Sequence, residues 1–556
     1  MNKDSGPAAT PKKQMDPEGG FSSQALLRQA AEYHQQEDPA AALEIYNKII
    51  THQPSNAQAL SMAGIAALQL GDYDEAARYL TASLSHAPEN WIALNNLGSA
   101  YREKGELDSA RDAYTQALRL NPEYENACYN MGELHQQLEE YEDAERAYLK
   151  ALSIRPDYVE ALGRLADLYE KTNRLEDASA IARRGLRIAP GDAPLNLVAA
   201  RCCRRKKKLD AAFKKLADYK NLTGYEALAE EINFELGYLH DRNGEYEKAF
   251  THFSAGNEAA LRDCLEKKSG ISKDLYLKKI DDLTSFMRAV ASDTNAELPE
   301  PETTPVFLIG FPRSGTTLLS QVLDSHPSVQ TLDEMPSVFS MEEALKDFPQ
   351  GMPEALNSLT LENVEHLRSV YFQTVSQYVE VRPGSVFVDK FPLHIADAPL
   401  ISRIFPTAKY LFALRHPYDV CLSCFMQSFE LNNAMANFTT LEDTATLYMK
   451  IMDLWLASIE KLQTDYMTVR YENMIRDLEG ESRLFLDFIG VDFNQEVLRF
   501  DKHAQANLNI NTPSYHQVTQ PIYNDALNRW KKYDNYLDGI KLILSPYLER
   551  FDYDTT

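Results

Sequence analysis

A spacing of 34 residues runs through the N-terminal half of the chain and constrains its fold more than any other feature. Prolines recur at this spacing as Pro54, Pro88, Pro122, Pro156 and Pro190, and alanines as Ala42, Ala76, Ala110, Ala144 and Ala178. Three glycines keep the same spacing, and Ala166 takes the fourth place: Gly64, Gly98 and Gly132. A proline at a fixed position ends a helix, and small residues let two helices approach closely. The spacing therefore predicts an α solenoid of stacked helix pairs.

The pattern resembles the tetratricopeptide repeat, and residues 91–122 show it almost whole. We predict an array over residues 23–268, after a disordered tail over residues 1–22, with degenerate units near residues 209–212 and 237–250. The resemblance implies a concave surface that holds a peptide or a protein. The alternative is a rigid solenoid that takes no part in binding.

The chain is acidic, with 57 Lys and Arg against 82 Asp and Glu and a formal net charge of −25. Nucleic acids and anionic membranes repel such a chain, so we expect neither as a partner, and an anionic ligand needs a locally basic pocket. The basic run at residues 204–208 is interpreted as a solvated turn between helices. No apolar run reaches the ~20 residues of a membrane span, and the N-terminus does not read as a signal peptide. Six cysteines are too few for a disulfide framework, so we expect a cytoplasmic location.

The C-terminal half begins with a phosphate-loop pattern. Residues 295–304 are polar and contain proline, so we place a helical connector and linker at 269–304 and a separate α/β domain at 305–556. The apolar run 306–309 predicts a buried strand that leads into Gly310–Thr317 and then into a helix. A strand, loop and helix in this order direct backbone N–H groups at a phosphate. Thr316 stands where nucleoside triphosphatases need lysine, which argues against a triphosphate ligand.

Residues 312–319 resemble the 5′-phosphosulfate loop of sulfotransferases, and a second family motif follows the predicted strand 409–414. This second motif is Arg415 with Ser423 eight residues later, the 3′-phosphate site of the family. The resemblance implies a doubly wound parallel sheet of the P-loop nucleotide-kinase type and 3′-phosphoadenosine 5′-phosphosulfate (PAPS) as donor, with adenosine 3′,5′-bisphosphate as product. The residues it implies in binding PAPS are Arg313, Ser314, Gly315, Thr316, Thr317, Leu318, Arg415 and Ser423.

The same resemblance implies the residues of the transfer step. Glu334 matches the general base of tyrosylprotein sulfotransferases, and Lys390 matches the lysine at the bridging oxygen of the leaving group. Ser514 matches the serine near the sulfate, with Tyr515 as its alternative in another alignment. His394 is the second candidate for the base, although a packing role is also compatible with its position.

Two further residues are implied near the donor, and two positions depart from the family. Tyr471 resembles a tyrosine near the adenosine, or is a core residue, and Arg529 holds the basic position before the family's tryptophan. Thr519 and Pro336 stand where arginine is usual, and Pro336 argues against a tyrosine-peptide acceptor. The acceptor could be a peptide, a carbohydrate or a small molecule.

These features predict a sulfotransferase that moves a sulfuryl group to an acceptor hydroxyl, with the repeats recruiting a protein or peptide. The alternatives are a scaffold whose transferase-like domain binds nucleotide without turnover and a P-loop kinase. We expect no metal, and we interpret Cys421 and Cys424 as core residues rather than a redox pair.

Overall fold

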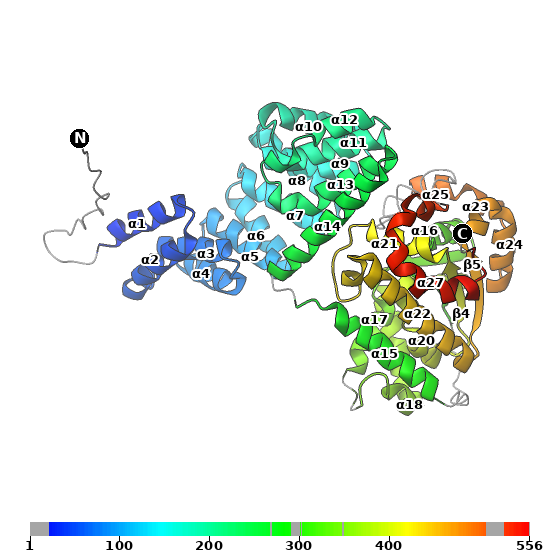
Figure 1. Ribbon diagram of the computed structural model, residues 1–556. Coiled ribbons are helices and arrows are strands. Elements are labelled where there is room, and N and C mark those ends of the chain that lie inside the picture. Colours follow the sequence, from blue (N-terminus) through cyan, green and yellow to red (C-terminus); the bar gives the residue numbers. More distant parts are fainter. Residues whose placement is uncertain are drawn as a thin grey trace, which may run out of the picture. The chain divides into compact units, whose positions relative to one another are not determined.

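The computed structural model describes residues 22–266, 270–290, 301, 303–346, 348, 350–506 and 527–554. Contacts divide the chain into two compact units, Met1–Lys206 and Lys207–Thr556. Figure 1 follows the chain through the helices of the first unit into the mixed helices and strands of the second. Among the described residues, no helix has both the length and the apolar character needed to cross a membrane.

The first unit is a stack of antiparallel helix pairs. Its helices are α1 (Ser23–Gln35), α2 (Pro39–His52), α3 (Ala57–Gln69), α4 (Tyr73–His86), α5 (Trp91–Glu103), α6 (Leu107–Leu120), α7 (Glu125–Gln137), α8 (Tyr141–Ile154), α9 (Val159–Lys171), α10 (Leu175–Ile188) and α11 (Ala193–Arg205). The glycines of the 34-residue spacing lie where paired helices meet. A Cβ atom on Gly98 would lie 2.6 Å from the Tyr114 ring, and one on Gly132 would lie 2.6 Å from the Tyr148 ring. The predicted α solenoid is confirmed, and close approach of the two helices explains its small residues.

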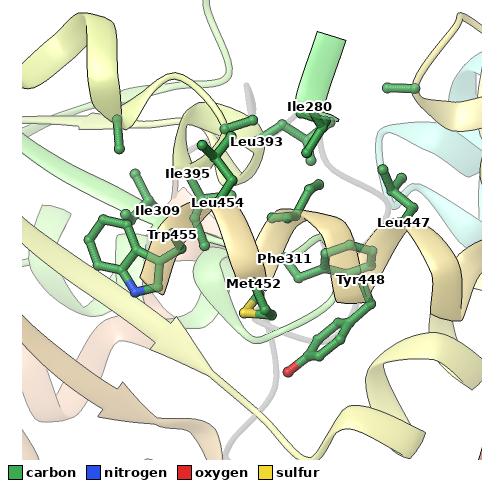
Figure 2. Packing of buried hydrophobic residues seen from close by; sticks show 14 of the residues in the cluster. Ile280, Ile309, Phe311, Leu393, Ile395, Leu447, Tyr448, Met452, Leu454 and Trp455 are labelled. Atoms are coloured by element: carbon green, nitrogen blue, oxygen red, sulfur yellow. The ribbon is translucent and has the colours of Figure 1, made fainter. Parts of the chain in front are cut away.

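The second unit begins with helices that the sequence assigns to the repeats and the connector. They are α12 (Leu209–Lys215), η1 (Tyr219–Asn221), η2 (Glu226–Leu228), α13 (Ala229–Arg242), α14 (Tyr246–Glu266) and α15 (Lys273–Ala289). Phe253 of α14 and Ile280 of α15 belong to the same buried cluster as Phe311 and Trp455. Figure 2 shows part of this cluster, with Ile280 beside the side chains that surround Phe311 and Trp455. The helices from α13 to α15 are thus part of the core of the second unit, while the domain boundaries at residues 268 and 304 stay predictions.

The second unit is built on a five-stranded parallel sheet in the order β2-β3-β1-β4-β5. The strands are β1 (Val306–Gly310), β2 (Val329–Asp333), β3 (Val386–Lys390), β4 (Lys409–Leu414) and β5 (Asp465–Arg470). All five residues of β1 are buried, as expected of a central strand that helices cover on both faces. The order reverses between β1 and β4, where ligands of doubly wound sheets bind. The predicted doubly wound α/β fold is confirmed.

Helices cover both faces of the sheet, each over its own apolar cluster. The remaining elements are α16 (Thr316–Asp324), α17 (Ser337–Leu345), α18 (Ala355–Ser358), α19 (Leu361–Ser376), η3 (Pro392–Ile395), α20 (Ala398–Ile404), α21 (Pro417–Phe425), η4 (Met435–Phe438), α22 (Leu441–Leu462), α23 (Tyr471–Arg476), α24 (Leu478–Ile489), η5 (Gln495–Arg499), α25 (Phe500–Ala506), η6 (Arg529–Tyr536) and α27 (Asp538–Arg550). Helices α16 and α24 pack on one face, and α19, α20 and α22 pack on the other. The carboxyl ends of the parallel strands therefore meet at one edge, and the sequence motifs lie there.

Candidate active site

The loop between β1 and α16 has the geometry of an anion-binding turn. Gly315 has φ = +99° and directly precedes the first turn of α16. A Cβ atom on Gly310 would lie 2.6 Å from the carbonyl oxygen of Ala413, and one on Gly315 would lie 2.6 Å from the Tyr471 ring. Only glycine fits either position, because a side chain would displace the neighbouring strand or the ring. The loop is thereby held close to β4 and opens toward the positive end of the helix dipole.

Polar groups of this loop are buried and available to a ligand. Thr316 and Thr317 are the first two residues of α16, and both are buried, as is Leu318 after them. The hydroxyl of Ser314 is also buried and has no hydrogen-bond partner among the described residues. A buried hydroxyl without a partner is unfavourable unless a ligand supplies one. The structure thus fits the predicted role of these residues in binding an anion.

The second predicted motif meets the first. Arg415 follows β4, and its Nη1 donates to the carbonyl oxygen of Arg313 at 3.2 Å. Ser423 of α21 accepts from Nε of Arg313, also at 3.2 Å. The Arg415 guanidinium lies 4.7 Å from the centre of the Tyr471 ring. The structure therefore brings Arg313, Arg415, Ser423 and Tyr471 together, in a chain whose net charge is −25.

An aspartate that the sequence reasoning missed supports this group. Asp419 of α21 lies 3.9 Å from Nη2 of Arg415. Its carboxylate also accepts from the backbone N–H groups of Asn528 at 3.0 Å and Trp530 at 2.9 Å. Burial raises the pKa of Asp419, and Arg415 opposes this rise. Asp419 thus connects α21, the helix that follows Arg415, to η6, and its position four residues after Arg415 was the available signal.

The predicted base and the predicted lysine form an ion pair. Nζ of Lys390 donates to Oε1 of Glu334 at 2.6 Å and lies 3.9 Å from Oδ1 of Asp333. The Lys390 side chain is fully buried, whereas 37% of the Glu334 side chain is exposed. Glu334 is held in the left-handed region at φ = +53°, and its backbone N–H donates to the carbonyl oxygen of Lys390 at 2.7 Å. The pair therefore presents an accessible carboxylate beside a buried cation.

Asp333 is a second acid at this point that the sequence reasoning did not single out. Its carboxylate accepts from the Ser320 hydroxyl of α16 at 2.6 Å. Burial raises the pKa of Asp333, while Lys390 and Ser320 act in the opposite direction. Asp333 therefore links the helix after the phosphate loop to the strand end that carries Glu334.

The structure places His394 in a different environment from Glu334. The imidazole is buried 3.7 Å from Oδ1 of Asp389 and 3.5 Å from Oδ2 of Asp397. Burial lowers its pKa, but the two carboxylates outweigh this effect and raise the pKa of His394 to about 9. A histidine that is already protonated near neutral pH cannot take a proton from an acceptor. The geometry thus supports Glu334 rather than His394 as the base.

The protonated state of His394 predicts a dependence of stability on pH. Because folding raises the pKa of His394 from 6.5 to about 9, its stabilising contribution is complete below pH 6.5 and disappears as the pH rises through 9. We expect this contribution to be about 3 kcal/mol in the free energy of unfolding. Urea denaturation of wild type and of His394→Gln at pH 6.5 and pH 9 measures it. The wild type should lose more stability than the variant, and equal losses would contradict the assignment.

Arg529 pairs with an aspartate of α13. Its Nη2 pairs with Oδ2 of Asp241 on α13 at 2.7 Å, and the same aspartate accepts from the Tyr533 hydroxyl. Its chain neighbours Asn528 and Trp530 donate to Asp419, which lies 3.9 Å from Nη2 of Arg415. Asp241 therefore holds the half-buried guanidinium, and the expected contact of Arg529 with the donor stays a prediction. Ser514, Tyr515 and Thr519 lie outside the described residues.

The cysteines and the acidic clusters offer no competing chemistry in the described residues. Cys421 and Cys424 are buried, and burial raises the pKa of both thiols. One group of metal-ligand type, His135 with Glu140 and Asp143, lies in the first unit. Arg111 pairs with Glu140 at 2.9 Å, so a cation is already present at that carboxylate.

Comparisons with known proteins agree with this arrangement. The sulfotransferase family model matches residues 305–495, and the model of the cilia and flagella-associated protein 70 C-terminal domain matches residues 2–260. An uncharacterized protein of Aquifex aeolicus (strain VF5) is 26% identical over 274 residues, which are 45% of this chain and 34% of that protein. The chain thus spans about a third of the length of this relative.

Two other proteins are similar to part of the chain. Protein-tyrosine sulfotransferase 1 of Danio rerio is 24% identical over 266 residues, which are 45% of this chain and 72% of the relative. A tetratricopeptide repeat protein from Parabacteroides merdae ATCC 43184 is 23% identical, with a TM-score of 0.36, over 43% of this chain and 93% of that structure. The chain therefore joins a tetratricopeptide-repeat-like region to a domain of the sulfotransferase family, related to protein-tyrosine sulfotransferases.

Proposed function

We propose that the chain is a PAPS-dependent sulfotransferase that transfers a sulfuryl group to an acceptor hydroxyl. The observation that carries the proposal is the Lys390–Glu334 ion pair, at the same edge of the sheet as the phosphate loop and Arg415. When bound, PAPS would supply the sulfuryl group and leave as adenosine 3′,5′-bisphosphate. The residues present fit this donor, because a buried unpaired hydroxyl, two glycines without room for a side chain and two arginines converge there.

The chain's own residues divide the work between binding and transfer. Ser314, Thr316 and Thr317 would hold the 5′ end of the donor at the start of α16, while Arg415 and Ser423 would hold the 3′-phosphate. A guanidinium recognises a phosphate with two parallel N–H groups, so Arg415 also fixes the orientation of its ligand.

Glu334 and Lys390 are placed for the transfer step. The exposed carboxylate of Glu334 would accept the proton of the acceptor hydroxyl as this oxygen becomes nucleophilic. The buried ammonium of Lys390 would neutralise charge that develops on the leaving oxygen. Neither side chain would need a large movement for the transfer step, because the backbone N–H of Glu334 already donates a hydrogen bond to the carbonyl oxygen of Lys390.

Turnover of labelled PAPS tests the proposal against its alternatives. Three acceptors would be compared: a tyrosine peptide, an oligosaccharide and a simple phenol. Pro336 argues against the tyrosine peptide but does not identify the acceptor, so all three classes are needed. Label transfer by the wild type, lost in Glu334→Gln, supports the enzyme. Binding of adenosine 3′,5′-bisphosphate without transfer to any acceptor favours the scaffold, and turnover of ATP favours a kinase.

We also propose that the repeat array binds an extended acidic peptide. Ser99, Glu133, Asp167 and Arg201 occupy equivalent positions, 34 residues apart, on α5, α7, α9 and α11. Glu133 pairs with Arg102 at 2.6 Å and with Arg164 at 3.0 Å. Asp167 pairs with Lys171 at 2.9 Å and with Arg201 at 3.5 Å. Each of these two carboxylates thus meets two cations, and Arg102 also pairs with Glu103 at 2.8 Å, so four cations face three carboxylates along this row.

The peptide proposal predicts an effect of charge reversal. We expect the double variant Arg164→Glu and Lys171→Glu to weaken binding of a labelled glutamate-rich peptide by about tenfold or more, since two attractions become repulsions. Fluorescence anisotropy measures this affinity, and Arg146→Glu on α8 is the matched control, because Arg146 pairs with Asp143 outside this row. Preference for a lysine-rich peptide would contradict the proposal.

A reducing cytoplasmic location also remains a proposal, and it is supported by the small number of cysteines, six in 556 residues.

A further inference from the structure

A buried aspartate lies next to Lys390 in the sequence and on the opposite face of the sheet. Asp389 has no exposed surface. Side chains alternate along a strand, so Lys390 faces Asp333 and Glu334 while Asp389 faces the cluster that contains Tyr371. Oδ2 of Asp389 accepts from the Ser337 hydroxyl at 2.6 Å and from the Tyr371 hydroxyl at 2.7 Å. This carboxylate makes no direct contribution to the transfer step described above.

Ser337 connects Asp389 to the base. It is the first residue of α17, three residues after Glu334, and it is fully buried. Glu334 adopts φ = +53°, a conformation that is unfavourable for a residue with a Cβ atom and that surrounding contacts must maintain. Two such contacts come from consecutive residues of β3. The carbonyl oxygen of Lys390 holds the backbone N–H of Glu334 at 2.7 Å, and Asp389 holds Ser337.

Helix α17 has a second anchor farther along. Oε1 of Glu342 accepts from Nζ of Lys279 on α15 at 2.6 Å, and the same ammonium donates to Asp397 at 3.1 Å. The helix is therefore fixed near both ends, and the segment 334–337 has little freedom to change its path. The Ser337–Asp389 hydrogen bond lies at the end nearer to the base.

We propose that Ser337 and Asp389 are positioning residues that hold the base loop so that the Glu334 carboxylate stays on Lys390. Asp389 acts through Ser337, and Ser337 acts through the backbone of residues 334–337. The catalytic consequence rests on the proposed sulfuryl transfer, whereas the structural consequence does not depend on it.

The chain offers a matched pair of variants for the test. Ser337→Ala and Tyr371→Phe each remove one buried hydrogen bond to the same oxygen of Asp389. Tyr371 belongs to α19 and makes no described hydrogen bond to residues 334–337. Tyr371→Phe therefore measures the effect of losing one buried hydrogen bond to Asp389 without changing a contact of the base loop. Both changes delete a hydroxyl without adding atoms, which favours folding of both variants.

Two measurements on the full chain decide the matter. Hydrogen exchange of the Glu334 backbone N–H should be at least about tenfold faster in Ser337→Ala than in wild type and unchanged in Tyr371→Phe, because only the first loosens the base loop. The kcat for sulfuryl transfer should fall by about tenfold or more in Ser337→Ala, with KM for PAPS within about twofold, and stay within about twofold of wild type in Tyr371→Phe.

The outcomes separate this inference from the proposed function. Equal exchange of the Glu334 N–H in the two variants would overturn the positioning role, whatever the activity. Faster exchange in Ser337→Ala alone, in a protein without sulfuryl transfer, would support the positioning role and reject the proposed function. Normal kcat in Ser337→Ala, with an active wild type, would overturn the catalytic consequence of the inference.

Discussion

Substitution Lys390→Ala is expected to lower kcat for sulfuryl transfer by about 1000-fold while the affinity for adenosine 3′,5′-bisphosphate stays within about threefold of wild type. The side chain is fully buried against Glu334, so its charge acts in a site from which water is largely excluded. There a cation stabilises developing charge far more than it would in water. The donor's phosphates, by contrast, are expected to contact the loop after β1 and Arg415, which this substitution leaves intact.

The measurement is single-turnover transfer from labelled PAPS, with calorimetry of the product nucleotide. Lys409→Ala is the matched control, because Lys409 begins β4 at the other end of the parallel sheet and donates to the carbonyl oxygen of Phe488. The Lys409→Ala variant should therefore keep kcat near the wild-type value. Normal turnover in Lys390→Ala would remove this lysine from the transfer step.

The second large effect is expected at Arg415. We predict that Arg415→Ala weakens binding of adenosine 3′,5′-bisphosphate by about 100-fold, since charge-assisted hydrogen bonds to a phosphate contribute about 1.5–3 kcal/mol. Binding of adenosine 5′-phosphate, which lacks the 3′-phosphate, should change by less than about threefold, because its phosphate is expected to bind the loop at α16.

The two nucleotides and the variant form a thermodynamic cycle that isolates the 3′-phosphate contact. Competition binding measures all four affinities. Arg483→Ala supplies the control, because it removes the same charge from α24, where Arg483 pairs only with Glu479 among the ion pairs of the described residues. Equal losses for both nucleotides in Arg415→Ala would assign the arginine to the loop structure instead of the 3′-phosphate.

The features that sequence predicted well are those that local spacing controls. The 34-residue period follows from helix pairs that repeat along the chain, and the loop at 310–317 follows from glycines that one strand-to-helix turn requires. Arg415 and Ser423 are also close in sequence: α21 begins two residues after Arg415 and carries Ser423, and both residues contact Arg313. The structure adds one contact that the sequence did not predict, because the Ser423 hydroxyl accepts a hydrogen bond from Nε of Arg313.

The features that sequence missed depend on contacts between distant segments. Arg529 pairs with Asp241, a residue 288 positions earlier, and no local pattern predicts this contact with α13. His394 follows Lys390 closely, yet Asp389 and Asp397 determine its charge. The base loop is similar, because Ser337 and Asp389 are ordinary residues until the pairing of β2 with β3 brings them together.

The role of α13 and α14 shows the same limit. Their sequence continues the repeat pattern, but Phe250 of α14 stacks on Tyr536 of η6 with ring centres 4.1 Å apart. Asn257 of α14 donates to the carbonyl oxygen of Phe425, the last residue of the Ser423 helix, at 2.9 Å. The repeat period predicts that α13 and α14 form a helix pair, but it does not predict which other elements pack against that pair.

The most direct test of the central claim is calorimetry of the wild-type chain with adenosine 3′,5′-bisphosphate and with ADP. Both ligands carry adenosine and two phosphates, and they differ in whether one phosphate is on the 3′ oxygen. We expect the bisphosphate to bind at least about tenfold more tightly than ADP. Arg415 and Ser423 are the proposed contacts of a 3′-phosphate, and Thr316 stands where triphosphate sites have lysine. Equal affinity, or tighter binding of ADP, would contradict the assignment of this site to a sulfuryl donor.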